Sequence, residues 1–387
     1  MIKNILIIMG ISLLWAGIAE PDINTTRARG MYNAFVGLSN DGGALYYNPA
    51  GLQYVDAEYY NKLTRVDKLL EESTRGHVYG GADYLGNLGF SQLISYIGSG
   101  KPITSVEMIK LNTGLDKNAY NKKAISVSLY SESTGFAFNA IENLEYKFYS
   151  SYFEVKKDKK LVASIGKSFE LGSISVGISG HGVLLSREYS KPTYTAVASA
   201  NIKDYGMFEQ YVFADSCNPS ILNGAGLAAN IGMMTELNNF RVGVAMENFI
   251  ASDISLSPIK GTATQNLKAD EDWAIKNLMA GISYSDGDLV FDMDVHNLNR
   301  KAKEVTYHIG IEKDLLSFWV FPTLRVRLGG SFSQLYSGYA TGVAFKLWIF
   351  QTNISYMEKI LNVDQFADTI LTEAKDQQLN LNVEMSF

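Results

Sequence analysis

Side chains that could carry polar chemistry lie at an even spacing within each of three C-terminal segments: Asp292 and Asp294, His308 and Glu312, and Arg325 and Arg327. Residues separated by an even number lie on one face of a β-strand. If their segments form neighbouring antiparallel strands, His308 can sit opposite either aspartate, and Glu312 can sit opposite Arg325. Such pairs could line a polar pore or dock a plug. Each also stabilises a sheet by a few tenths to about 1 kcal/mol, and we favour that structural role.

Other residue combinations do not indicate an enzyme. The four histidines are scattered, and only His296 and His308 share an expected hairpin, whereas a zinc site needs several converging ligands. The single cysteine, Cys217, excludes a disulfide within the chain and a cysteine-based zinc site. A serine–histidine hydrolase inside a barrel stays conceivable, but the sequence singles out no serine. We expect neither a metal nor another cofactor.

The element that must position these side chains is the β-strand, because hydrophobicity alternates along most of the chain after residue 53. The last segment, Leu379–Phe387, is apolar at every odd position and polar at every even one. The same alternation recurs in segments around 174–179, 240–247, 289–296, 305–312, 324–329 and 350–356. Weaker runs lie near 54–64, 75–84, 87–97, 124–131, 134–156, 160–168, 225–236, 276–285 and 339–347.

Strands of about ten residues match the length that crosses a bilayer at a tilt. The pattern predicts an all-β protein, a transmembrane antiparallel β-barrel of about 14 strands. The alternative is a soluble β-sandwich, which also alternates. We favour the barrel because Tyr and Phe gather near strand ends and Phe387 ends an amphipathic strand. Longer connections are expected near 98–123, 187–222, 251–275 and 358–377, the last with helical spacing; long loops should face outward.

Composition and the N-terminus agree with export. Charged residues make up 19% and aromatic residues 12%, and the net charge is -6, which argues against a nucleic-acid partner. Residues 1–19 contain Lys3, an apolar run and the small residues around Ala19, the pattern of a cleaved secretory signal. A membrane anchor is the alternative, but the apolar run is short for one. We therefore expect the outer membrane of a diderm bacterium, with its lipid as a partner.

Residues 20–53 are small and Gly-rich and should form a plug segment inside the barrel (54–387). Within them, Asn48-Pro49-Ala50-Gly51 has the composition of a type I turn, with Asn first, Pro second and Gly fourth. This turn could be part of a plug, or it could only lead into the first strand.

The segment resembles the start of FadL-like outer-membrane proteins, with a closer similarity to the PorV and TraF-like branches. The residues that carry the resemblance are Gly30, Met31, Ala34, Phe35, Val36, Asp41, Ala44, Asn48, Pro49, Ala50 and Gly51. The resemblance implies a 14-stranded barrel with the Asn-Pro-Ala turn inside an N-terminal plug. It covers residues 27–52; beyond them only architecture and length agree.

The function expected from this resemblance is the uptake or passage of hydrophobic small molecules across the outer membrane, such as long-chain fatty acids or hydrocarbons. The plug segment is short for a fatty-acid transporter, and the sequence shows no set of ligand-pocket residues. The alternative is a PorV-like accessory barrel of a protein secretion system, which binds cargo or translocon components. A purely structural or adhesive barrel is a third reading.

Overall fold

The structure is a computed structural model that describes residues 25–55, 77–99, 118–131, 133–149, 151–200, 202, 204–261, 269–270, 275–316, 323–347, 350–361 and 375–386. Its long strands are β1 (His77–Asn87), β2 (Asn118–Ser131), β3 (Thr134–Phe148), β4 (Phe153–Leu171), β5 (Ile174–Ser190), β6 (Ser220–Leu237), β7 (Phe240–Ala251), β11 (Asn277–Asp286), β12 (Leu289–His296), β13 (Thr306–Leu316), β14 (Thr323–Phe332), β15 (Tyr336–Leu347), β16 (Phe350–Leu361) and β17 (Lys375–Ser386). Shorter strands are β8 (Ile254–Ser255), β9 (Ser257–Lys260) and β10 (Ala269–Asp270). The helices are α2 (Thr26–Gly30), α3 (Ala44–Tyr47), α6 (Leu88–Gly98), α8 (Tyr194–Ala198) and α9 (Tyr205–Val212), with 3-10 turns η1 (Pro49–Gly51), η2 (Asp215–Cys217) and η5 (Ala302–Glu304).

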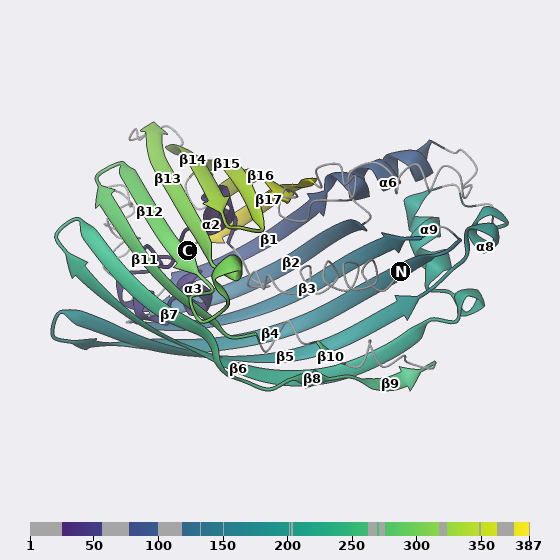
Figure 1. Ribbon diagram of the computed structural model, residues 1–387, viewed down its shortest axis with the longest axis horizontal. Helices are drawn as coiled ribbons and strands as arrows, with labels where there is room; N and C mark the ends of the chain where they lie inside the picture. Colours follow the sequence, from purple (N-terminus) through teal and green to yellow (C-terminus); the bar gives the residue numbers. More distant parts are fainter. Residues whose placement is uncertain are drawn as a thin grey trace.

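Fourteen of the described strands, β1–β7 and β11–β17, form a closed antiparallel ring (Figure 1). Each pairs with its neighbours in chain order, and β1 closes the ring by pairing with β17, as in Ala82 opposite Val383. The predicted fold class is therefore confirmed, with the strand at 289–296 at its expected bounds. Closure satisfies the backbone hydrogen bonds that an open sheet would leave at its edges.

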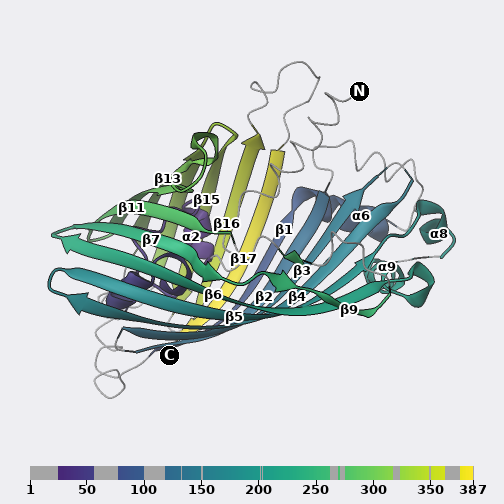
Figure 2. The same cartoon turned by 60° about the horizontal axis from the view of Figure 1, so that its bottom comes forward.

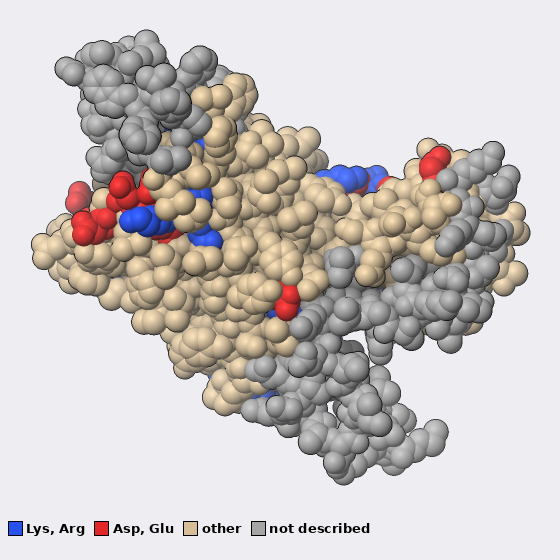
Figure 3. Space-filling view, turned by 90° about the horizontal axis from the view of Figure 1, so that it is seen from above, with Lys and Arg blue, Asp and Glu red and all other residues tan. Residues whose placement is uncertain are grey.

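The ring has its apolar face outside and its polar face inside. On β17, Leu379, Leu381 and Val383 are exposed, whereas Asn380 and Asn382 are buried. On the face in Figure 3, Lys, Arg, Asp and Glu cluster at the left and are sparse elsewhere on the tan surface. Apolar area on this scale marks contact with a partner or a membrane. We infer that the outer face lies in lipid, because water would favour the opposite arrangement.

Two parts of the sequence-based assignment are wrong. The run at 87–97 is not a strand but helix α6, whose Phe90, Leu93 and Ile97 share one buried face at helical spacing, and the Asn87 side chain caps its first turn. The run at 134–156 is two strands, β3 and β4, joined by a short turn.

Strand β3 changes the face that it buries halfway along. Asn139 and Ile141 are buried inside the ring, but Leu144, Tyr146 and Phe148 have the opposite parity and are also buried. They pack on the outer face against α6, α8 and α9, which lie at the right-hand end in Figure 1. The strands there extend beyond the lipid-facing surface, and the helices cover their apolar outer face.

Above the N-terminal segment, a short strap formed by residues 252–260 folds onto the inner face. Ile254 and Leu256 are buried against inward-facing residues of β3–β6, among them Val162 and Leu222. Gly224 gives this strap room, because a Cβ there would lie 2.7 Å from the Ser255 carbonyl oxygen. The strap thus covers the inner surface of β3–β6.

Several expectations lie outside the described residues. These are the signal at 1–19, most of the run at 54–64, the helical stretch within 358–377 from residue 362 to 374, and Phe387. Among the described residues, no helix is long and apolar enough to cross a bilayer.

Candidate functional site

Residues 25–55, here called the N-terminal segment, lie within the ring of strands (Figures 1 and 2). Helix α2 packs on β14–β17, η1 packs on β4–β6, and α3 packs on β4 and β7. The apolar side chains of the segment, including Met31, Phe35 and Leu45, are fully buried. The segment therefore spans the lumen from one wall to the other.

Local capping explains why so short a segment holds one shape. The Thr25 hydroxyl accepts a hydrogen bond from the Ala28 N–H and starts α2, and the Asn48 side chain accepts one from the Ala50 N–H and starts η1. Between them, Tyr32 and Asn33 adopt positive φ values of 53° and 62° and reverse the chain. These turns fix the path of the segment, and its apolar side chains then pack on one another and on Tyr130, Ala137 and Val290 of the wall.

The wall carries glycines where the segment touches it. The inward positions involved are Gly166, Gly177, Gly232, Gly243, Gly281, Gly310, Gly329 and Gly338, which belong to strands β4–β7, β11 and β13–β15. A Cβ on Gly177 would lie 2.2 Å from the Ala50 nitrogen, and one on Gly329 would lie 2.3 Å from the Met31 carbonyl carbon. Backbone therefore rests directly on backbone, which leaves no space between segment and wall along this arc.

Asp294 on β12 holds the middle of the segment. Its carboxylate accepts hydrogen bonds from the backbone N–H groups of Phe35 at 2.5 Å, Val36 at 2.6 Å and Gly37 at 3.3 Å. The side chain is fully buried, and hydrogen bonds to a buried charge are stronger than neutral ones. Asp292, two residues earlier, is also fully buried and lies against Gly37.

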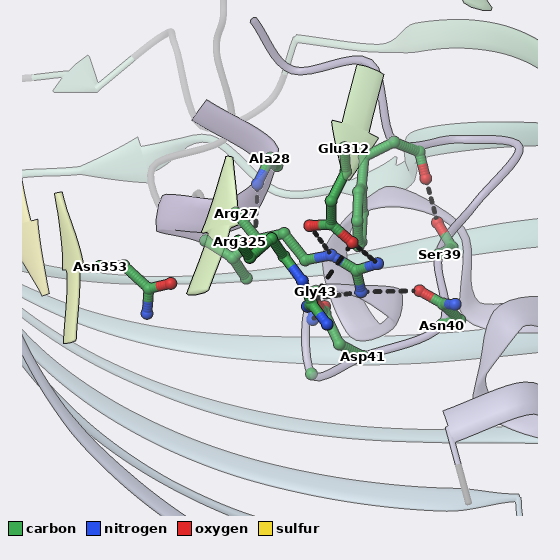
Figure 4. A network of polar contacts seen from close by, with 12 residues as sticks. Arg27, Ala28, Ser39, Asn40, Asp41, Gly43, Glu312, Arg325 and Asn353 are labelled. Atoms are coloured by element: carbon green, nitrogen blue, oxygen red, sulfur yellow. Dashed lines mark hydrogen bonds and ion pairs between the residues drawn. The ribbon is translucent and has the colours of Figure 1, made fainter. Parts of the chain in front are cut away.

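Glu312 on β13 holds the start of the segment. It forms a bidentate pair with Arg27, with Nη2–Oε1 and Nε–Oε2 distances of 2.7 Å and 2.9 Å, and it also accepts from Arg327 Nε at 2.7 Å (Figure 4). Arg27 also donates to Asn40 Oδ1 at 2.9 Å. One buried carboxylate thus joins the N-terminal segment to the wall.

The register differs from our expectation for this cluster. Glu312 pairs with Arg327 rather than with Arg325, and Arg325 stands opposite Asp314, with which it forms a bidentate ion pair. Its Nη1 lies 3.5 Å from Glu312. Alternation alone does not choose between the two registers, because either one keeps the same residues inside. The β13–β14 register is also irregular between Asp314 and Leu316.

His308 stands opposite Asp294 across the β12–β13 pair, one of the two arrangements that we expected. Its ring nitrogens do not bond that carboxylate: Nδ1 lies 2.8 Å from the Tyr32 carbonyl oxygen and Nε2 lies 3.0 Å from Thr306 Oγ1. His296 instead approaches Asp294 at 3.6 Å. His308 therefore contacts the N-terminal segment through the Tyr32 carbonyl oxygen.

The Asn48-Pro49-Ala50-Gly51 motif is buried against β4–β7, with Asn48 at the junction of β6 and β7. Asn48 Nδ2 donates to the Val36 carbonyl oxygen at 3.3 Å and to the Met233 carbonyl oxygen at 3.2 Å. Gly51 cannot be replaced without movement, since a Cβ there would lie 1.9 Å from the Ser39 carbonyl oxygen. The motif ties two turns of the segment to each other and to the wall.

A second polar cluster escaped the sequence analysis because its members lie on four separate segments. The His181 ring stacks on Tyr46 at a centroid distance of 5.3 Å, and its Nδ1 lies 2.9 Å from Ser164 Oγ. Its Nε2 lies 3.1 Å from both Ser179 Oγ and Asn230 Nδ2. The inward parity of these polar residues on β4–β6 was the available signal.

This serine–histidine arrangement does not suit nucleophilic catalysis. Ser179 donates its proton to the Leu45 carbonyl oxygen at 2.7 Å, and the Asn230 amide donates to His181 Nε2. The nitrogen that would act as a base is therefore occupied, and all these groups are buried beneath the N-terminal segment. Among the described residues, no group of three potential ligands could hold a metal ion.

The wall itself is interrupted beside this cluster. The β6–β7 register shifts between Ala229 and Ile231, and Asn248 in the interruption has a φ of 52°. Asn230 joins the two features: its Oδ1 accepts from the Asn248 N–H at 2.8 Å, and its Nδ2 donates to the Tyr46 carbonyl oxygen at 3.2 Å. The position of the segment is thereby coupled to an irregular part of the wall.

Comparison with known proteins identifies solved structures with the same fold. The toluene transporter TbuX of Ralstonia pickettii has a TM-score of 0.54 at 12% identity, covering 95% of this chain and 99% of that one. The toluene transporter TodX of P. putida has a TM-score of 0.52 at 12% identity, with coverages of 95% and 99%. The monoaromatic hydrocarbon channel CymD has a TM-score of 0.51 at 10% identity, with coverages of 93% and 96%. No protein-family model and no curated protein matches the chain.

Proposed function

We propose that this protein is an outer-membrane channel for hydrophobic small molecules. The observation that carries the proposal is the combination of an apolar outer surface, a closed ring of 14 strands and a lumen crossed by the N-terminal segment. The shared fold with hydrocarbon channels supports it. Monoaromatic hydrocarbons and longer alkyl chains are the ligand classes to test, and passage needs no bond-making.

In this proposal, residues 1–19 are removed on export, and residues 20–53 act as the plug of the barrel formed by 54–387. The charged side chains that we singled out, among them Asp294 and Glu312, dock the plug and do not contact the ligand. The ligand enters from the end that carries the long connections, on the side of the plug where the strap of residues 252–260 packs on the wall.

The exit that we propose lies at the β6–β7 interruption. A displacement of α3 would break the bond between Asn230 and Tyr46 and free the Asn230 side chain that also holds Asn248. Phe249 and Ile250, next to Asn248, are exposed on the outer face. A hydrophobic molecule leaving here would pass directly into lipid and would not need to cross water.

Uptake by intact cells tests this function. Cells that express the protein should accumulate radiolabelled toluene or a long-chain fatty acid faster than cells with an empty vector. The polysaccharide layer on the outer membrane slows the entry of hydrophobic molecules, and the channel would let them pass it. Asn230→Leu should raise the rate, because it removes both hydrogen bonds that hold the interruption closed, whereas Asn239→Leu, in an exposed turn, should not change it. Equal uptake with and without the protein would refute the proposal.

A second candidate is a PorV-like accessory role in protein secretion. It is favoured by the ordered helices α6, α8 and α9, which form a structured surface at one end of the barrel. Affinity purification from crosslinked cells separates the candidates: recovery of translocon or cargo proteins would support this role, and their absence would leave the channel.

A further inference from the structure

Burial on the inner face is uneven around the ring. On β2, the inward residues Ala124, Ser126 and Ser128 are only half-buried. Their partners on β3, in the same order Ile141, Asn139 and Ala137, are 3%, 3% and 9% exposed. The compared residues of β2 and β3 stand directly opposite one another and so lie at the same depth in the barrel. Their difference in exposure therefore reflects what covers each strand.

The arrangement of the N-terminal segment explains this difference. Its helices and turns pack on β4–β7 and on β14–β17, and wall glycines contact the segment in both regions. The strap of residues 252–260 covers the inner face of β3–β6 toward the end that carries the long connections. Strands β1 and β2 lie between these two contact regions, and the inward Gly81 of β1, beside Ser126, is also half-buried.

This half-buried row continues along β2. Tyr120 and Lys122, toward the end that carries the long connections, are half-buried as well. Apart from Ala124, the row offers hydroxyl, ammonium and backbone groups; Ser126 Oγ lies 3.5 Å from the Gly81 carbonyl oxygen. We call residues 120–128 on the inner face of β2 the polar stripe, and its chemistry suits water and small polar solutes.

The stripe ends at Tyr130, which is 3% exposed. The Tyr130 hydroxyl donates to the Gly42 carbonyl oxygen of the N-terminal segment at 3.0 Å. Its ring lies over Gly135, where a Cβ would approach to 2.9 Å. One side chain therefore bridges from the β2 wall to the segment at the end of the barrel with short turns.

We propose that the lumen contains a second, hydrophilic route along the polar stripe, and that Tyr130 closes this route at the end of the barrel with short turns. This route is separate from the proposed hydrophobic passage, which leaves the barrel on the opposite side, at β6–β7. Its substrates would be water, small inorganic ions and small uncharged polar solutes, since the row presents mainly hydroxyl and ammonium groups, with Ala124 and the Tyr120 ring as its apolar parts.

Conductance across a planar bilayer in potassium chloride tests the route. The natural protein should conduct little, and Tyr130→Ala should raise single-channel conductance several-fold. Tyr130→Phe keeps the ring and should stay closed. In the Tyr130→Ala background, Ser128→Trp should block the current again, whereas Val127→Trp, which faces lipid, should not. A Tyr130→Ala variant that conducts like the natural protein, or a current unaffected by Ser128→Trp, would overturn the proposal.

Water access to the stripe provides a measurement that does not depend on removing Tyr130. In a Cys217→Ser background, Ser126→Cys should react with a small hydrophilic thiosulfonate in the folded, detergent-purified protein. Asn139→Cys, its buried neighbour on β3, should not react. Equal protection of both cysteines would contradict the proposal, and neither result depends on the uptake of hydrophobic molecules.

Discussion

At the residue scale, single buried carboxylates fix the N-terminal segment. Asp294 accepts three backbone N–H groups and Glu312 binds two arginines, and both side chains are nearly inaccessible to solvent. Leaving such donors without an acceptor costs about 1–3 kcal/mol for each buried group. These polar contacts add to the packing of the segment's buried apolar side chains.

Asp294→Asn should loosen the segment and leave the barrel intact. The amide keeps the shape but loses the charge, and its N–H group repels the donors of Val36 and Gly37; we expect a loss of about 2–4 kcal/mol in docking free energy. Limited proteolysis should then cleave within residues 25–55 while the barrel still resists SDS at room temperature. Asp288→Asn, in an exposed turn, is the control, and equal protease resistance in both variants would contradict this role.

At the element scale, the contact between η1 and β5 depends on the absence of a side chain. A Cβ on Gly177 would lie 2.2 Å from the backbone of Pro49 and Ala50, and neither partner can move without disturbing the Asn48 cap. Gly180 on the same strand faces outward, with nothing within 4 Å of its Cβ position. The two glycines therefore have different structural roles although they lie on the same strand.

Gly177→Ala should lower the temperature at which the folded barrel loses its SDS resistance, because overpacking a close contact costs about 1–3 kcal/mol. Gly180→Ala should leave that temperature unchanged or raise it slightly, since alanine favours a strand over glycine. The comparison uses gel mobility of unheated and heated samples. Equal effects of the two substitutions would show that η1 does not rest on the wall at Gly177.

At the scale of the whole molecule, the ring has two different ends. One end carries short turns, and the other carries α6, α8, α9 and η2. If the long connections face outward, Cys217 in η2 is at the cell surface, where it is partly accessible. Burial raises the pKa of its thiol above the ordinary value, so the reactive thiolate is scarce at neutral pH.

A membrane-impermeant maleimide should therefore label Cys217 on intact cells, slowly at pH 7 and faster as the pH rises toward 9, because deprotonation continues through that range. With Cys217→Ser, the variant Asp288→Cys, in a short turn at the opposite end, should be labelled only after the outer membrane is permeabilised. Labelling of Asp288→Cys but not of Cys217 on intact cells would reverse the orientation.

The sequence by itself determined the all-β class, the closed ring and the inward face of most strands, because side-chain alternation depends only on local geometry. It also indicated that Asp294, His308 and Glu312 share the inner face. It predicted a strand where α6 lies, because this helix is short and its sequence also fits an alternating pattern. It could not choose between Arg325 and Arg327 as the partner of Glu312, since both satisfy the same alternation.

Only the tertiary structure decided how the interior is filled. The glycines on eight strands, the His181 cluster and the contact of Tyr130 with Gly42 each join residues far apart in the chain. Each depends on contacts between segments distant in the sequence, which no local pattern records. Alternation specifies which side chains point inward, whereas packing of the N-terminal segment against them decides which stay accessible to water.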